Sequence, residues 1–300
     1  MQWFKGNLHT HAREGESDSS VEDVANWYKN HGYQFLVITD HSVVTFPPSF
    51  STIMDSSFLL IPGIEVVGKV GKDVLEINGL NIHEDISPIR DDTIPKTLQT
   101  CIDVVRRQNG VPLINHPNYQ WRLSQEVILG AENCYLFEVN NAFPGIHNEG
   151  NVEHPGLEEV WDFLLTSGKH IYGVASDDAH SYQEFSPELS NPGRGWVMVK
   201  AWNLDIDEIM RNLDSGLFYS STGVKIAEIN VQPFRIEIVI QETENTAYKT
   251  DFIGSEGKVL LSTTHNPAVY NLSSERHYVR GKITDSNGCY AWLQPVFVVQ

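Results

Sequence analysis

Apolar runs of strand length recur through the first 180 residues, and each ends at polar side chains that can bind a metal ion or move a proton. The run Phe35–Ile38 leads to Asp40 and His41, and the run Val111–Ile114 leads to His116. The same pattern places His9 and His11 after Trp3 and Phe4, Glu65 after residues 58–61, His83 after 75–82, Asn140 after 135–139, and Asp177, Asp178 and His180 after 171–175. Because the carboxyl ends of parallel strands meet on one face of a barrel or open sheet, we expect these side chains to lie close together.

Segments with helical periodicity separate the apolar runs. Residues 20–32, 93–110, 155–168 and 205–216 place apolar side chains three and four positions apart, and each segment ends at a glycine. Ser20 and Thr93 are suited to cap the first two helices, and Pro155 suits the first turn of the third. This alternation of strands and helices up to about residue 220 predicts an α/β fold with a largely parallel sheet.

The sequence pattern changes after Gly223. Apolar and polar residues alternate, as in residues 235–240, and glycine, proline and asparagine interrupt the runs. We therefore predict two domains, residues 1–224 and residues 225–300, of which the second is a small antiparallel β unit, like a β-sandwich. His265 and His277 lie in this second part, and we interpret both as surface residues.

Composition limits the partners that the protein can have. The 300 residues carry a formal net charge of -18, which disfavours a nucleic-acid polymer, and no run is apolar enough to span a membrane. The three cysteines, Cys101, Cys134 and Cys289, are widely spaced, which favours reduced thiols and, with no signal peptide expected, a cytoplasmic location. The expected partner is a small-molecule substrate, and an anionic one is compatible with bound metal ions.

His9-Thr10-His11 is the most specific single motif, because His-x-His at a strand end directs two imidazoles into one pocket. Mixed imidazole and carboxylate ligands suit zinc, manganese or iron, and the absence of cysteine ligands argues against a closed structural zinc site. Two ions that share a carboxylate can ionise a water between them near neutral pH, since its pKa falls from about 15.7 towards roughly 7. Such a hydroxide is the nucleophile of a hydrolase.

The order of these residues resembles the PHP (polymerase and histidinol phosphatase) superfamily of metal-dependent hydrolases over about residues 5–225. Asn115-His116-Pro117 with Trp121-Arg122, the run Ser176 to His180, and the turn Pro192 to Trp196 are similar to its CehA/McbA-like branch. The resemblance implies a distorted (β/α)7 barrel with two or three divalent ions. It implies one site made by His9, His11, Glu65 and Asp178, a second by Glu65, His83 and His116, and a third by Asp18, His41 and His180. The loop of residues 12–20 offers both Glu16 and Asp18, so either carboxylate can serve the third site.

Three functions compete. The resemblance favours hydrolysis of phosphate mono- or diesters, with Arg194 or Arg122 neutralising the anionic group and Asp40 orienting His41 or shuttling a proton. An alternative is hydrolysis of a carboxyl ester, carbamate or amide in an apolar pocket, and a third possibility is a metal-stabilised binding domain without turnover. The candidates for supporting the metal ligands from behind are Asp177, Asn115, Glu138 and Asn140.

Overall fold

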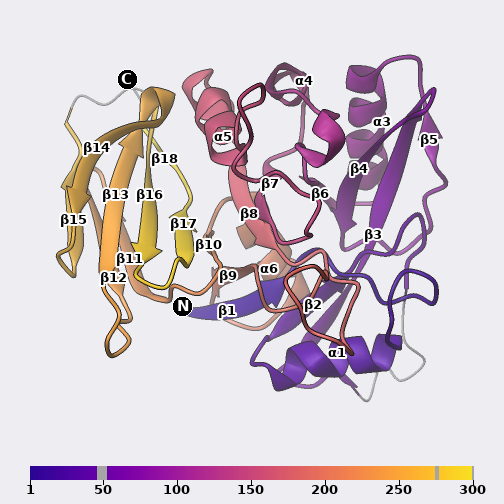
Figure 1. The fold of residues 1–300 in the computed structure, drawn as a ribbon, viewed down its shortest axis with the longest axis horizontal. Helices are drawn as coiled ribbons and strands as arrows, with labels where there is room; N and C mark the ends of the chain where they lie inside the picture. Colours follow the sequence, from indigo (N-terminus) through magenta and orange to yellow (C-terminus); the bar gives the residue numbers. More distant parts are fainter. Residues whose placement is uncertain (46–52, 274–276, 299–300) are drawn as a thin grey trace.

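The computed structural model describes residues 1–45, 53–273 and 277–298 (Figure 1). One large mixed sheet runs through the molecule in the order β14-β13-β16-β17-β10-β9-β1-β2-β3-β4-β6-β7-β8. The strands of its first part are β1 (Gln2–Asn7), β2 (Phe35–Ile38), β3 (Leu59–Val70), β4 (Asp73–Leu80), β5 (Ile89–Arg90), β6 (Val111–Ile114), β7 (Leu136–Asn141), β8 (Tyr172–Ser176), β9 (Trp196–Ala201) and β10 (Phe218–Ser221). Most of these strands are apolar along their length, which explains why their interior positions are buried on both faces.

The sheet is only partly parallel. β1, β2 and β3 are parallel to one another, as are β6, β7 and β8, but β4 is antiparallel to both β3 and β6. β9 is antiparallel to β1 and to β10. Strand pairing among the described residues therefore does not show the expected seven-stranded barrel. β8 and β10 are instead linked through Ser220, whose hydroxyl donates to Gly173 O at 2.7 Å and accepts from Ala175 N at 3.1 Å.

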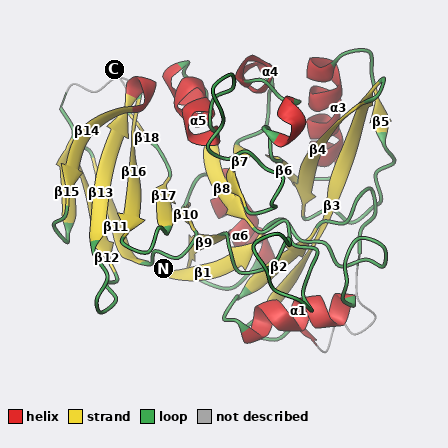
Figure 2. Cartoon of the chain, in the orientation of Figure 1, coloured by secondary structure: helices red, strands yellow, loops and turns green. Residues whose placement is uncertain are grey.

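The helices lie outside the sheet (Figure 2), and their caps follow the sequence. They are α1 (Val21–Asn30), α3 (Ile94–Arg107), α4 (Gln125–Gly130), α5 (Leu157–Thr166) and α6 (Ile206–Asp214), with short 3-10 turns η1 (Tyr119–Trp121) and η2 (Ser255–Gly257). The side chains of Ser20, Thr93 and Asp205 accept the backbone N–H three residues later, which confirms three predicted starts. α5 begins two residues after Pro155, because Gly156 is its N-cap. No described helix is long and apolar enough to span a membrane.

Residues beyond 225 form antiparallel strands, as the alternating pattern predicts. β11 (Ile226–Gln232), β12 (Arg235–Ile240) and β15 (Ala268–Asn271) form a separate small sheet. The others continue the large sheet through the pairing of β17 with β10: β13 (Tyr248–Gly254), β14 (Lys258–Thr263), β16 (Tyr278–Asp285), β17 (Tyr290–Leu293) and β18 (Val296–Phe297). His265 and His277 are exposed, as expected.

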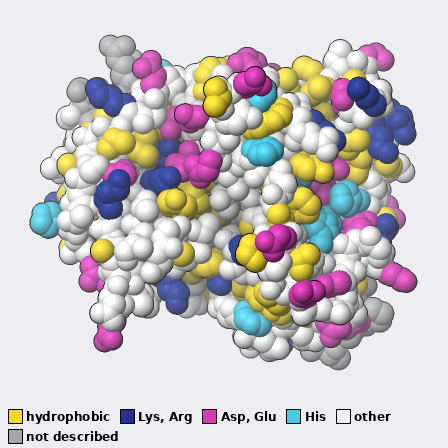
Figure 3. All heavy atoms as spheres, in the orientation of Figure 1, with side chains coloured by type: hydrophobic (Ala, Val, Ile, Leu, Met, Phe, Trp, Pro, Cys, Tyr) yellow, Lys and Arg dark blue, Asp and Glu magenta, His cyan; other side chains and the backbone are white. Residues whose placement is uncertain are grey.

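A buried ion-pair network joins this C-terminal part to α5. Arg280, only 1% exposed, donates from Nε to Asp162 Oδ1 and from Nη2 to Asp162 Oδ2, both at 2.7 Å. Tyr278 Oη donates to the same carboxylate, and Lys282 pairs with Glu158. In Figure 3, acidic and basic side chains meet at the surface between the C-terminal strands and α5. Because breaking a buried pair leaves an uncompensated charge, this network fixes the two parts against each other.

Candidate metal centre

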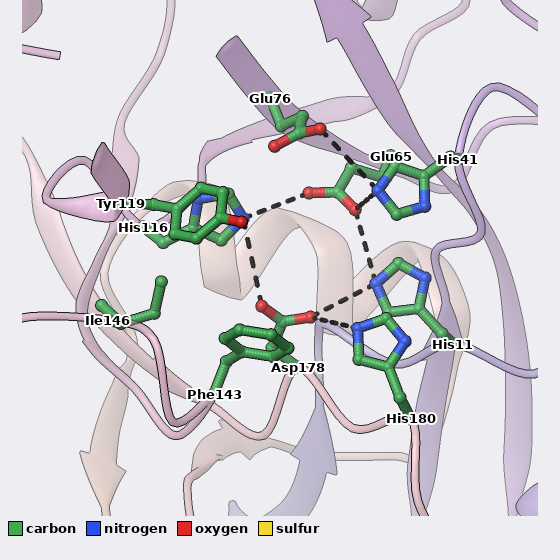
Figure 4. Close-up of a pocket in the computed structure, with 10 residues that line it drawn as sticks. All are labelled: His11, His41, Glu65, Glu76, His116, Tyr119, Phe143, Ile146, Asp178 and His180. Carbon is green, nitrogen blue, oxygen red and sulfur yellow. Dashed lines mark ion pairs between the residues drawn. The ribbon is translucent and has the colours of Figure 1, made fainter. Parts of the chain in front are cut away.

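Seven of the nine predicted metal ligands lie together at one edge of the large sheet, and Figure 4 shows all of these except His9. Each comes from a strand or from the segment that follows its carboxyl end. His9 and His11 follow β1, His41 follows β2, Glu65 lies within β3, His116 follows β6, and Asp178 and His180 follow β8. All of these side chains except His9, which is buried behind them, line a pocket of about 200 Å³, together with Glu76, Tyr119, Phe143 and Ile146.

Glu65 lies at the centre of the cluster and is 1% exposed. Its Oε1 atom lies 3.4 Å from the Nε2 atoms of both His9 and His116. Its Oε2 atom lies 3.4 Å from His11 Nε2 and 3.2 Å from His41 Nε2. One carboxylate therefore faces two pairs of imidazoles, which is the arrangement that a bridging ligand requires.

Asp178 forms a second meeting point for the imidazoles. Its Oδ1 atom lies 3.3 Å from the Nε2 atoms of His9 and His11 and 3.4 Å from His180 Nε2. The backbone of Asp178 has φ 48° and that of His116 has φ 20°, values that non-glycine residues rarely adopt. Such strain is typical of functional sites, because the surrounding structure must hold it.

The donor atoms fit divalent ions. The Nε2 atoms of His9 and His11 are buried and have no hydrogen-bond partner, which a ligand would supply. The nitrogen–oxygen separations of 3.3–3.4 Å around them match the edge of a tetrahedron, about 3.4 Å for bonds of about 2.1 Å. Among the residues that the structure describes, three groups have donor atoms within 4.8 Å of one another: His9, His11 and Asp178; His9, Glu65 and His116; and His11, Glu16 and His41.

Without a metal ion, the carboxylates of the cluster raise the pKa of the neighbouring histidines, so these histidines bind protons. Burial lowers the pKa of His11, but the neighbouring carboxylates of Asp178, Glu16 and Glu65 outweigh it and raise the pKa to about 9. Burial also opposes the charged form of His9, yet Asp178, Glu138 and Glu65 raise its pKa well above the usual value. Conversely, although burial raises the pKa of Glu65, the nearby histidines hold it well below its usual range. The carboxylates thus attract positive charge, whether from protons or from metal ions.

Glu138 supports two of the imidazole-bearing segments from behind. It is fully buried and its Oε1 atom accepts from His9 Nδ1 at 2.8 Å and from Ser176 Oγ at 2.6 Å. Its Oε2 atom accepts from the backbone N–H of His116 at 2.7 Å and from Asn141 Nδ2 at 2.8 Å. A proton held on His9 Nδ1 leaves Nε2 free to bind an ion. Glu138 therefore fixes the orientation of His9.

Two amides support the carboxylates. Asn115 Nδ2 donates to Glu65 Oε1 at 2.7 Å, and Asn141 Nδ2 donates to Asp178 Oδ2 at 3.1 Å. Sequence reasoning selected Asn140 instead of Asn141. The reason is an irregularity in the pairing of β7 with β8, where Glu138 pairs with Val174 but Asn140 pairs with the next residue, Ala175. The extra residue reverses the alternation, so Glu138 and Asn141 both reach the site.

The loop after His11 brings in Glu16 and not Asp18. Glu16 Oε2 lies 3.2 Å from His11 Nδ1 and 3.0 Å from His41 Nδ1, and the Glu16 carbonyl lies 2.7 Å from His180 Nδ1. The Asp18 carboxylate is exposed and accepts from the backbone N–H groups of Tyr182 and Gln183. Glu16 thus contacts all three imidazoles on this side through their Nδ1 atoms, whereas Asp18 holds the neighbouring loop.

His83 is exposed and does not line the pocket, which corrects the expectation that it joins the cluster. Because β4 is antiparallel, its carboxyl end points away from the edge where the parallel strands end. Glu76, near the other end of β4, lines the pocket instead, with Oε1 3.7 Å from His41 Nε2. Burial and the proximity of Glu65 raise the Glu76 pKa. The sequence feature that indicates an antiparallel β4 is Gly71 between two apolar runs. In the structure Gly71 has φ 59°, which is typical of a two-residue hairpin turn.

The predicted catalytic residues lie around the pocket but do not line it. Asp40 Oδ1 accepts from the backbone N–H groups of Ala12 and Arg13, so Asp40 shapes the loop that carries His11.

The arginines also differ from expectation. The Arg194 guanidinium donates to Leu189 O, Ser186 O and Asn191 Oδ1, so it holds a surface loop and is not directed into the pocket. The Arg122 guanidinium lies 5.2 Å from the centroid of the Tyr119 ring and does not line the pocket, although its charge acts to lower the pKa of Glu76. Asp177 accepts from the backbone N–H groups of residues 193–195, which closes the glycine-rich turn.

No protein-family model and no curated protein sequence matches the chain. Among solved structures, a two-domain protein from Bacteroides vulgatus containing a predicted PHP-like metal-dependent phosphoesterase aligns with 97% of this chain and 95% of its own, at 15% identity and TM-score 0.52. A protein from Bifidobacterium adolescentis assigned as a metal-dependent phosphoesterase aligns with 69% of this chain and 94% of its own, at 11% identity and TM-score 0.44. An amidohydrolase from Chromobacterium violaceum aligns with 62% and 93%, at 11% identity and TM-score 0.43. The first alignment shows that this chain shares the fold of that Bacteroides vulgatus protein over nearly its whole length.

Proposed function

We propose that the protein is a metal-dependent hydrolase that cleaves phosphate mono- or diesters of a small molecule. The observation that carries the proposal is the convergence of four imidazoles on Glu65 and of four on Asp178, with buried, unpartnered Nε2 atoms on His9 and His11. In a core with a purely structural role, buried ring nitrogens normally have hydrogen-bond partners.

Two divalent ions, zinc, manganese or iron, would be held by residues of the first two donor groups. His9, His11 and Asp178 suit one ion, and His116 with Glu65 suits the other, with Glu65 shared. His41, His180 and Glu76 are the candidates for a third. Ions bound there supply Lewis-acid activation of water and stabilise negative charge on the substrate.

The chain's own residues prepare this chemistry. Glu138 and Glu16 orient the imidazoles through their Nδ1 atoms, and Asn115 and Asn141 hold the two carboxylates. Oriented ligands need little reorganisation during the reaction, which favours catalysis. Two ions carry a formal charge of about +4 against one charge each on Glu65 and Asp178, and the surplus favours a phosphoryl group with its spread negative charge.

A specific observation favours the alternative of carboxyl ester, carbamate or amide hydrolysis. Phe143 and Ile146 line the pocket and give it an apolar side, while the Arg194 side chain is committed elsewhere. An acyl transfer needs only one oxyanion stabilised and suits such surroundings. We keep it as the second candidate.

We further propose that residues 1–224 form the catalytic unit as a distorted barrel, that residues 225–300 form a supporting domain, and that the protein works in the cytoplasm without a nucleic-acid polymer or a membrane as partner.

The test compares kcat/KM for p-nitrophenyl phosphate and its diester with a p-nitrophenyl carboxyl ester and an aryl carbamate, with manganese or zinc supplied. The proposal expects the phosphate substrates to react fastest and Glu65→Gln to remove that activity. A faster carbamate or carboxyl ester replaces the phosphoesterase assignment with the alternative. No turnover of any substrate by metal-loaded protein contradicts both.

A further inference from the structure

The pocket has two chemically different sides. Figure 4 shows Tyr119, Ile146 and Phe143 along one side and His11, His41 and His180 along the other. We call Tyr119, Phe143 and Ile146 the apolar wall. The rings of Tyr119 and Phe143 lie 6.3 Å apart at 81°, a favourable edge-to-face arrangement. A group bound in the pocket therefore has apolar side chains on one side and metal-ligand candidates on the other.

The apolar wall directly contacts the metal cluster. The Phe143 ring lies 5.7 Å from the His180 ring at 79°, and the Tyr119 ring lies 5.5 Å from the His116 ring at 69°. Because these two rings lie directly beside metal-ligand candidates, a substrate group attached to the hydrolysed bond would lie close to them.

The segment that carries Phe143 and Ile146 is held firmly. Asn141 and Asn148 exchange hydrogen bonds: the Asn141 N–H donates to Asn148 Oδ1 at 3.0 Å, and Asn148 Nδ2 donates to Asn141 O at 2.8 Å. Asn141 also binds Asp178. The apolar wall and a metal ligand therefore share one anchor, which fixes their separation.

The far end of the same segment is anchored on η1. Asn118 Nδ2 donates to the carbonyl groups of His147 and Pro155, both at 2.9 Å. The Trp121 ring stacks between His147, at 4.9 Å, and His154, at 4.3 Å. These contacts preorganise the wall, so that binding a flat group does not require the loop to be ordered first.

The pocket offers little to a second charged group. None of the described residues that line it is Lys or Arg, and Glu76 adds negative charge. Its volume of about 200 Å³ is below the roughly 300–1,000 Å³ of sites that hold drug-sized ligands. Nucleotides and sugar diphosphates would place further charge against Phe143 and Ile146, where burial of a charge is costly. The Arg122 guanidinium lies 5.2 Å from the Tyr119 ring centroid, but it donates to Gln120 and does not line the pocket.

We propose that the apolar wall selects small aryl esters, in which an uncharged aromatic group is attached directly to the hydrolysed phosphoester bond. This inference rests on the proposed function and names its substrate class. Phe143 and Ile146 are specificity-determining residues that receive the aromatic group, whereas Tyr119 borders it.

The experiment compares phenyl phosphate with methyl phosphate on metal-loaded wild-type protein and on Phe143→Ala, with Phe143→Leu to keep apolar volume. The intrinsic difference between the two leaving groups cancels, because the same pair is measured on each variant. Phe234→Ala removes the same ring from an exposed site in the turn between β11 and β12 and serves as the matched control. We expect Phe143→Ala to lower kcat/KM for phenyl phosphate about tenfold or more, with a much smaller change for methyl phosphate.

Binding of phenylphosphonate and methylphosphonate, measured by calorimetry, separates this inference from the proposed function. Tighter binding of phenylphosphonate that Phe143→Ala abolishes supports the wall even when neither phosphate is hydrolysed, in which case only the phosphoesterase proposal fails. Equal losses for phenyl and methyl substrates in Phe143→Ala overturn the wall. So does 4-carboxyphenyl phosphate reacting as fast as phenyl phosphate, because the added charge should reduce kcat/KM.

Discussion

Replacing Glu65 by glutamine tests the centre of the metal cluster without changing its size. Asn115 Nδ2 donates to Glu65 Oε1, so the amide oxygen of a glutamine would keep that position. The amide nitrogen would then occupy the place of Oε2, which faces His11 and His41. A nitrogen that donates cannot bind a metal ion. We therefore expect Glu65→Gln to lose the bridge and its negative charge together.

The size of the effect follows from the number of ligands. Four-ligand zinc sites bind with about 10–16 kcal/mol at pH 7, so one ligand contributes about 2.5–4 kcal/mol, or about 100-fold to 1,000-fold in affinity. Glu138→Gln leaves every ligand in place but disturbs the orientation of His9, and comparable outer partners change affinity about 10-fold to 100-fold. The exposed Glu84 provides a control, Glu84→Gln, for the loss of one negative charge.

Elemental analysis and competition with a chromophoric chelator measure these changes, with far-UV circular dichroism as the check on folding. Wild-type protein should carry at least two divalent ions per chain, and Glu65→Gln should carry at least one fewer. Affinity should fall in the order Glu84→Gln, Glu138→Gln, Glu65→Gln. Equal and mild effects for the last two variants would refute the bridging role of Glu65.

Three further outcomes are expected. In metal-free protein, the raised pKa of His11, about 9, lets this side chain keep a proton that the unfolded chain loses near pH 6.5. The proton's contribution to stability is therefore complete below pH 6.5 and is lost as the pH rises through 9. The urea midpoint should fall over this range, and a midpoint that rises contradicts the assignment. Arg280→Leu should reduce the free energy of unfolding by about 3–5 kcal/mol in thermal or urea melts, because Asp162 is left buried without its partner. Adding Asp162→Leu to the same chain should restore part of this free energy. A loss below about 1 kcal/mol is inconsistent with a buried pair. His116→Ala should lose metal while His83→Ala keeps the wild-type metal content, since only His116 faces Glu65; metal loss in His83→Ala would show that the exposed histidine reaches the site.

Features of this protein that depend on local pattern could be predicted from the amino-acid sequence. Helix starts at Ser20, Thr93 and Asp205 could be predicted, because a capping side chain acts within three residues. Buried strands could be predicted from apolar runs, and the convergence of His9, His11 and the other strand-end residues followed from the rule for parallel strands. These features need only short-range chemistry and one topological principle.

Which of two nearby polar residues enters the site depends on how the strands pair in the folded protein. The direction of β4, set by a hairpin, exchanges His83 for Glu76, and one extra residue in β7 exchanges Asn140 for Asn141. In each pair both side chains can serve the site and the two residues lie close together in sequence, so residue type alone does not show which one enters it. Strand direction and side-chain alternation are properties of the pairing with other strands, and a change of one residue moves a side chain to the opposite face. Arg194 shows the same limit, since its loop partners become available only when the chain has folded around it.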